Sequence, residues 1–279
     1  MTTFTTNPSL IPMYARAFAA MGKPKTTESI PHLEANMKSE IDPTLLGRYN
    51  TVCGFANGKV PITFPYAMGG SLQLWLWTRP EFPVRIIGGV HVKNQIESFR
   101  ELSPGEKVEL RVRTGECRQV RLGTEHDVIT ELVDSSGKVV WVSTSTNMAP
   151  GKPRYKKESS QYEEPLYNET AEFPVPKGIG LEYGKVCRDL NPIHVHPIGA
   201  KLFGFPTPIA HGMWAIARSL PFLEREGSRI SSLVVRFRKP IPIGKGVRLH
   251  FLKEGNTTHY ALKNLKGDVT HLEGSLSFN

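Results

Sequence analysis

The chain has 279 residues, of which 39% are hydrophobic and 22% are charged. This composition is typical of a globular protein and excludes a disordered or fibrous chain. Lys and Arg outnumber Asp and Glu by 35 to 26, which gives a formal charge of +9. Such an excess suits simple solubility or a polyanionic partner, for example a phosphorylated cofactor or an acidic carrier protein. Because every apolar run is shorter than the roughly 18 residues that cross a bilayer, we expect no membrane insertion.

The three cysteines, Cys53, Cys117 and Cys187, lie far apart, and the sequence has no CxxC pair. The odd number of cysteines and their wide spacing argue against a disulfide framework or a zinc ribbon. The first 30 residues contain no basic start followed by an apolar block, because Arg16 interrupts the stretch 10–21. We therefore expect a reducing, cytoplasmic location.

The first half of the chain is predicted to hold one long helix and then a run of strands. Residues 1–40 receive no role. Residues 64–77 are apolar nearly all round, which indicates a buried helix. Val- and Ile-rich segments separated by turn signals at 103–105 and 134–137 follow, as expected of an antiparallel sheet. The predicted strands are 88–99, 107–113, 127–133 and 138–146.

A stretch at 149–165 is rich in Pro and charged residues and poor in apolar ones, so it is interpreted as a linker. The same order of elements then returns, with a helical part at 177–220 that includes a helix at 208–220. We divide the chain into an N-terminal unit (1–150), a linker (151–165) and a C-terminal unit (166–279). The predicted strands of the second half are 229–238, 246–253, 258–265 and 271–278.

The two halves also share residues, which indicates a duplicated unit. Each copy is a helix followed by a strand meander, so the fold class is α+β, with the helix packed on one face of the sheet. The copies differ at two polar positions. The second copy has Asp189 and His194 where the first copy has the apolar residues Phe55 and Val60. The pattern favours a catalytic half and a binding half. The matching residues are Tyr49, Val52, Cys53 and Asn57 in the first copy and Tyr183, Val186, Cys187 and Asn191 in the second.

The densest chemistry lies at 189–197, a segment with two prolines, where Asp189, Asn191, His194 and His196 fall within eight residues. Because proline disfavours helix in the residue before it, we expect a stiff, non-helical loop. Asp189 and His194 can then converge on one water molecule. A second loop at 204–211 leads into an apolar helix, and Gly212 offers an unhindered N–H at the positive end of that helix, where an oxyanion is stabilised.

These residues resemble a known family. The pattern Tyr183-x3-Cys187-x-Asp189-x-Asn191-Pro192-Ile193-His194 resembles the hydratase 2 motif of the MaoC-like dehydratases, which are (R)-specific enoyl-thioester hydratases of the hot dog fold. The segment 208–213 matches the family's entry into its central helix. Over residues 40–279 the chain is similar to double hot dog 3-hydroxyacyl-thioester dehydratases of bacteria, which implies two fused, helix-wrapped antiparallel sheets joined edge to edge.

The resemblance implies that Asp189 and His194 are the catalytic pair and that the N–H of Gly212 is the oxyanion donor. It makes Asn191, which orders the loop, a candidate substrate-binding residue together with Tyr183, His211 and Met213. Three positions depart from the family pattern. The family usually has Gly at Arg188, often has Ser, Thr or Gly at Cys187, and often has Asp at His196. Arg188 matters most, since a cation beside Asp189 favours the ionised carboxylate.

The implied reaction is reversible syn hydration of trans-2-enoyl thioesters to (R)-3-hydroxyacyl thioesters in fatty-acid metabolism. It needs no metal or redox cofactor; the acyl group is carried by coenzyme A or an acyl carrier protein. Three alternatives remain: a metal site built from His194, His196 and His211, a thioesterase with Cys187 as nucleophile, and a non-catalytic module that binds acyl thioesters.

Partners follow from the same reasoning. Arg236 and Arg238, with Lys239 and Lys245, are candidates for the phosphates of coenzyme A or for an acidic carrier protein. The dispersed charge and the missing motifs argue against nucleic acid. The sequence leaves open whether two chains pair as a homodimer. If the first helix frames the acyl chain, its candidate tunnel walls are Ala67, Met68, Leu72 and Trp75.

Overall fold

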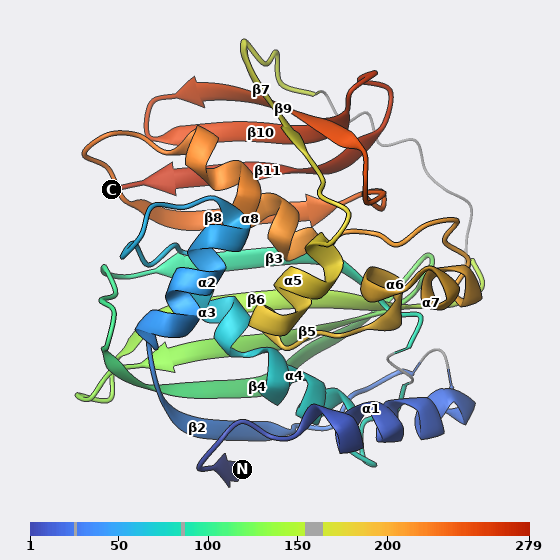
Figure 1. Ribbon diagram of the computed structural model, residues 1–279. Coiled ribbons are helices and arrows are strands. Elements are labelled where there is room, and N and C mark those ends of the chain that lie inside the picture. Colours follow the sequence, from blue (N-terminus) through green and yellow to red (C-terminus); the bar gives the residue numbers. More distant parts are fainter. Residues whose placement is uncertain (25–26, 85–86, 154–163) are drawn as a thin grey trace.

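The computed structural model describes residues 1–279 except 25–26, 85–86 and 154–163. In this part of the chain, eleven strands form a single sheet in the order β1-β2-β4-β5-β6-β3-β8-β11-β10-β9-β7 (Figure 1). The strands of the first half are β1 (Thr2–Phe4), β2 (Glu34–Glu40), β3 (Val90–Ser98), β4 (Lys107–Val120), β5 (Gly123–Val133) and β6 (Val139–Pro150). Those of the second half are β7 (Glu169–Pro174), β8 (Ile230–Phe237), β9 (Gly246–Glu254), β10 (Thr257–Asn264) and β11 (Thr270–Phe278).

The two halves of the sheet have matching strand orders. From the centre outwards, β3-β6-β5-β4-β2 corresponds to β8-β11-β10-β9-β7. The halves meet where β3 and β8 pair antiparallel, with Lys93 opposite Arg236 and Glu97 opposite Ser232. The expected continuous sheet is confirmed, and the pairing covers two edges that would otherwise expose backbone groups. The α+β double hot dog architecture follows.

The main helices cover one face of this sheet (Figure 1). The largest fully buried side chains include Trp141 and Trp214, whose indole N–H groups donate to the backbone carbonyls of Ile62 (2.8 Å) and Val52 (3.1 Å). The helices are α1 (Leu10–Ala19), the 3-10 helix η1 (Ala20–Gly22), α2 (Pro43–Cys53), α3 (Phe64–Met68), α4 (Gly70–Trp77), α5 (Ile179–Cys187), α6 (Pro192–Val195), α7 (Pro197–Leu202) and α8 (Gly212–Leu223).

Helices α2 and α5 are the corresponding helices of the two copies, and they pack on each other. Helix α2 begins at Asp42, whose carboxylate accepts the N–H of Thr44 at 2.7 Å, and ends at Gly54 with a φ of 79°. Helix α5 ends in the same left-handed conformation, but the residue there is Arg188, with a φ of 58°. A side chain therefore occupies a position that favours glycine.

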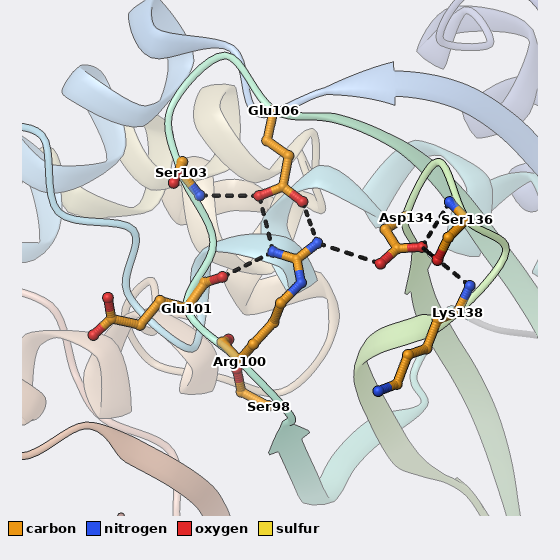
Figure 2. Close-up of polar contacts among 8 residues, drawn as sticks. All are labelled: Ser98, Arg100, Glu101, Ser103, Glu106, Asp134, Ser136 and Lys138. Atoms are coloured by element: carbon orange, nitrogen blue, oxygen red, sulfur yellow. Dashed lines mark hydrogen bonds and ion pairs between the residues drawn. The ribbon is translucent and has the colours of Figure 1, made fainter.

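The predicted turns at 103–105 and 134–137 lie side by side and are tied together by Arg100 (Figure 2). Its guanidinium forms ion pairs with Glu106 and, at 3.6 Å, with Asp134. Asp134 also accepts the backbone N–H groups of Ser136 and Lys138 at 2.9 and 3.1 Å. This network fixes the loops of the first half through its charged side chains.

Three strands were not predicted: β1, β2 and β7. Their sequences are short and polar, and they lie towards the edges of the sheet. They form because neighbouring strands offer backbone hydrogen-bond partners. They also bury alternate residues, such as Met37 in β2 and Phe173 in β7. The predicted limits of β4 and β5 were also too narrow, since both strands continue through polar residues as a hairpin in which Val120 pairs with Gly123.

The expected helix at 64–77 is divided into α3 and α4 at Gly69. At the start of α4 the backbone comes very close to the second copy: a Cβ added to Gly70 would lie 1.9 Å from the carbonyl oxygen of Cys187. The expected helix at 208–220 begins later, as α8, because residues 208–211 are extended and Ile209 forms a β-bridge with Pro242.

Most of the predicted linker lies outside the described residues, at 154–163. Among the described residues, every helix is too short or too polar to cross a membrane.

Candidate active site

The segment after α5 carries the predicted catalytic residues. Asp189 follows the left-handed Arg188, and Asn191 caps α6 by accepting the N–H of Ile193 at 3.3 Å. Asn191 and His196 are extended as predicted, but residues 192–195 and 197–202 form short helices, so the prediction of a non-helical loop was wrong. The reason is that proline is well suited to the first position of a helix, where its missing N–H costs nothing.

Asp189, His194 and His211 are brought together. One carboxylate oxygen of Asp189 and one ring nitrogen of each histidine all lie within 4.8 Å of one another. The rings of His194 and His211 stack with centroids 3.7 Å apart. The Asp189 side chain is 46% exposed, whereas that of His211 is 6% exposed, so the carboxylate lies on the more open side of the cluster and His211 on the buried side.

Backbone carbonyls fix the protonated nitrogen of each imidazole. His194 Nδ1 lies 2.8 Å from the carbonyl oxygen of Ile209, and His211 Nε2 lies 3.2 Å from that of Asp189. Because a carbonyl oxygen only accepts, each of these nitrogens must carry the hydrogen when the ring is neutral. His194 Nε2 is then left with a free lone pair.

The charge states follow from the surroundings. Burial lowers the pKa of His194 below its ordinary value of 6.5 and that of His211 to about 3, so both rings are neutral at neutral pH. The partial loss of hydration in the cavity would by itself raise the pKa of Asp189, but His211, His194 and hydrogen bonds from the Asn191 N–H and the Tyr14 O–H hold it below its ordinary value. The cluster therefore holds a carboxylate beside a neutral base.

Gly212 begins α8, where the first N–H groups have no acceptor within the helix. A Cβ at this position would lie 2.6 Å from the ring of Phe237. The glycine therefore allows Phe237 to pack closely at the start of the helix, and both residues line the same cavity as Asp189 and His194.

The other predicted binding residues all line the same cavity. Tyr183 and Met213 are buried and line the cavity, with the Tyr183 ring 5.2 Å from that of His211. Arg236 and Arg238, on either side of Phe237, also line the cavity. Arg238 is hydrogen-bonded to Glu273 at 2.9 Å, while Arg236 is exposed opposite Lys93.

Two alternative roles do not match the geometry. His196 is exposed and accepts the N–H of Ile198 at 3.2 Å, so the predicted trio of His194, His196 and His211 is not assembled; Asp189 takes the third place. Cys187 is buried, and burial raises the pKa of its thiol well above the ordinary value. A thiol held in that form is a poor nucleophile.

The cavity has a volume of about 1170 Å³ and extends from Asp189 along α4 towards β5 and β6. The predicted tunnel walls Ala67, Met68, Leu72 and Trp75 were wrong, because another face of the helix lines it. Since this helix is apolar nearly all round, the sequence could not indicate which face is turned to the cavity. The lining residues of α3 and α4 are Tyr66, Gly70, Gln73, Leu74 and Trp77.

One residue of the site was missed altogether. Tyr14 of α1 donates its hydroxyl hydrogen to Asp189 Oδ1 at 3.1 Å and accepts the N–H of Leu190 at 2.7 Å. Tyr14, Ala17 and Phe18 also line the cavity. The contact spans 175 residues of sequence, and no motif marks it.

Comparison with known proteins shows the family to which the chain belongs. Residues 167–274 match the MaoC like domain family. Over 97% of its length the chain is 30% identical to 3-hydroxyacyl-thioester dehydratase X of Mycobacterium tuberculosis, of which it covers 99%. The chain belongs to the MaoC-like dehydratase family.

This MaoC-like dehydratase is also similar to a solved structure and to part of a larger enzyme. It superposes on the crystal structure of HtdX from Mycobacterium tuberculosis with a TM-score of 0.72 and 26% identity, covering 88% of this chain and 99% of that one. It is also 36% identical over 91 residues to peroxisomal multifunctional enzyme type 2 of Mus musculus, a match to 30% of this chain and 12% of that protein.

Proposed function

We propose that the protein is a hydro-lyase that reversibly adds water to trans-2-enoyl thioesters, giving (R)-3-hydroxyacyl thioesters in fatty-acid metabolism. The observation that carries this proposal is the placement of Asp189 and His194, with a carboxylate oxygen of one and an imidazole nitrogen of the other within 4.8 Å. Two acceptors that share one water molecule stand about 4.5–5 Å apart, given hydrogen bonds of roughly 2.8 Å.

In the proposed mechanism, Asp189 and the free Nε2 of His194 accept the two hydrogens of a water molecule. As the water oxygen bonds to C3 of the substrate, one of its protons passes to the pair. Negative charge builds on the thioester oxygen, where the N–H of Gly212 stabilises it. A proton returned to C2 on the same face completes the addition, so that one water molecule is consumed and nothing is released.

We assign the halves different tasks. The C-terminal unit (166–279) supplies every group of the reaction, and the N-terminal unit (1–150) holds the acyl chain. This division is supported by the cavity, which leads from Asp189 to Gln73 and Trp77 of the first copy. It is also supported by the apolar Phe55 and Val60, which occupy the positions of the catalytic pair in that copy.

The carrier of the acyl group belongs to the same proposal. Arg236 and Lys93 stand opposite each other in the sheet and both line the cavity, and the net charge of +9 favours a phosphorylated or acidic carrier. Coenzyme A and an acyl carrier protein both meet this description. We expect the protein to act in the reducing cytoplasm, where its free cysteines would persist, and we leave homodimerisation to measurement.

The proposal is tested by incubating the protein with crotonyl-CoA and longer trans-2-enoyl-CoAs. We expect the enoyl absorbance to fall, the (R)-3-hydroxyacyl product to form and no free thiol to appear. Release of thiol would indicate a thioesterase instead. Tight binding without turnover at every chain length would indicate a binding module.

The pH dependence gives a second test. The proposed base is neutral His194, whose pKa lies below 6.5 because of burial. We therefore expect kcat/KM to be flat from pH 7 to 8 and to fall only below pH 6.5, as the ring gains a proton. Circular dichroism at each pH would separate this effect from unfolding. An acid limb centred above pH 6.5 would contradict the assignment.

Treatment with a chelator gives a third test. The proposed chemistry uses only proton transfers and backbone N–H groups, and one nitrogen of each imidazole is already bonded to a carbonyl. Prolonged dialysis against EDTA is therefore expected to leave kcat unchanged. Loss of activity that added Zn²⁺ restores would instead indicate that Asp189, His194 and His211 hold a metal.

A further inference from the structure

We propose that residues 7–14 form a strap across the active site and that Tyr14 is the positioning residue that orients the Asp189 carboxylate. This inference rests on the proposed function, because it assigns Asp189 the role of binding the reacting water. The strap comes from the N-terminal region, for which no role was predicted.

Tyr14 restrains Asp189 through two hydrogen bonds. Its hydroxyl group donates to Asp189 Oδ1 and accepts the N–H of Leu190, the next residue along the chain. Oδ1 also accepts the N–H of Asn191 at 3.1 Å. With Oδ1 committed to two donors, Oδ2 is the oxygen left to bind water. Burial, together with Asp189, raises the pKa of Tyr14 well above its ordinary value, so the hydroxyl group remains a donor.

Arg188 anchors the same segment. Its guanidinium donates to the carbonyl oxygen of Pro8 at 3.2 Å. Arg188 holds a φ of 58°, whereas the first copy has a glycine, Gly54, at the matching position. The strap therefore explains why an arginine occupies a backbone conformation that favours glycine.

Contacts to the first copy complete the strap. Ser71 of α4 donates to the side-chain oxygen of Asn7 at 2.5 Å. Helix α1 packs on α4, with Met13 and Ala17 buried. The segment thus contacts both copies, and its Tyr14 forms part of the cavity wall beside Asp189.

The test compares Tyr14→Phe with the wild type in crotonyl-CoA hydration. We expect kcat to fall about 10- to 100-fold, the range for losing a hydrogen bond to a charged group, while KM changes by less than about threefold. The matched control is Tyr260→Phe, which also loses a buried tyrosine hydrogen bond, to the Val234 carbonyl at 2.8 Å, but lies in β10. Its kcat should remain that of the wild type. A kcat for Tyr14→Phe within twofold of wild type would overturn the proposal.

Arg188→Gly separates positioning from folding. Glycine suits a φ of 58°, so the melting temperature should stay equal or rise, while kcat falls because the strap loses its anchor at Pro8. A parallel fall of melting temperature and kcat would indicate a merely structural role and would overturn the proposal.

Hydrogen exchange tests the strap independently of turnover. The N–H of Leu190 is protected by Tyr14, so the peptide 187–195 should exchange faster in Tyr14→Phe and not in Tyr260→Phe. Unchanged exchange overturns the strap. If exchange responds but the wild type hydrates no enoyl thioester, the proposed function fails and the strap stands.

Discussion

Replacing Asp189 by Asn is expected to lower kcat for enoyl-CoA hydration by about 10²- to 10⁴-fold, the usual contribution of a positioned acid or base. The amide keeps the shape of the side chain but loses the negative charge that stabilises a proton leaving water. Steady-state kinetics with crotonyl-CoA would measure the effect, and circular dichroism would confirm the fold.

The control for this change is Asp134→Asn. Asp134 is also a hydrogen-bonded carboxylate beside an arginine, but it lies in the turn network of Figure 2 and outside the catalytic cavity. The Asp134→Asn variant should be less stable than the wild type, and its kcat should be unchanged. If Asp189→Asn retained activity within about threefold of wild type, the carboxylate would not be the catalytic group.

The second large effect concerns packing behind the site. Gly180 of α5 lies against the backbone of α6, and a Cβ added there would lie 1.8 Å from the carbonyl oxygen of His194. Because two backbones must separate, Gly180→Ala should destabilise the fold by roughly 3 kcal/mol and displace His194. Thermal unfolding should record a melting point lower by roughly 6–12 °C, and hydration should be lost with it.

Gly47→Ala is the matched control. Gly47 lies within α2, and a Cβ there would meet nothing within 4 Å. The same substitution should therefore raise stability by about 0.5–1 kcal/mol, because alanine favours helix. If the two variants melted at the same temperature, the close approach of α5 and α6 would be wrong.

The strands that could be predicted from sequence are those rich in Val and Ile with clear turns between them. β3, β6 and β8 to β11 begin and end within a few residues of expectation. The strands β2 and β7, at or next to the edges of the sheet, could not be predicted, since they depend on pairing with β4 and β9 rather than on their own polar sequences. The polar ends of β4 and β5, which border the cavity, were missed for the same reason.

The candidate site divides in a similar way. Asp189 and His194 lie five residues apart on one rigid segment, so their proximity could be inferred from spacing and proline content. His211 joins them because the segment before it is held in place. The Ile209 carbonyl lies 2.8 Å from His194 Nδ1, and the next N–H, that of Ala210, donates to the carbonyl of Ile241 at 2.9 Å. Tyr14 could not be found, because its contact depends on how the N-terminal segment crosses both copies.

The structure explains Arg188, which stands where the family usually has glycine. From sequence it could only be weighed as a cation that alters the charge of Asp189. In the structure its guanidinium reaches Pro8, and the pKa of Asp189 is lowered by the histidines and by hydrogen bonds. A long-range contact therefore accounts for a residue that local reasoning treated as a perturbation.

The most direct test of the account follows the oxygen atom of the reacting water. Crotonyl-CoA and a longer trans-2-enoyl-CoA would be incubated with the protein in ¹⁸O-labelled water, and the products analysed by mass spectrometry. The account predicts one ¹⁸O in the C3 hydroxyl group of an intact (R)-3-hydroxyacyl-CoA. Label in a free carboxylate, with release of coenzyme A, would show that water attacks the thioester carbonyl instead and would contradict the account.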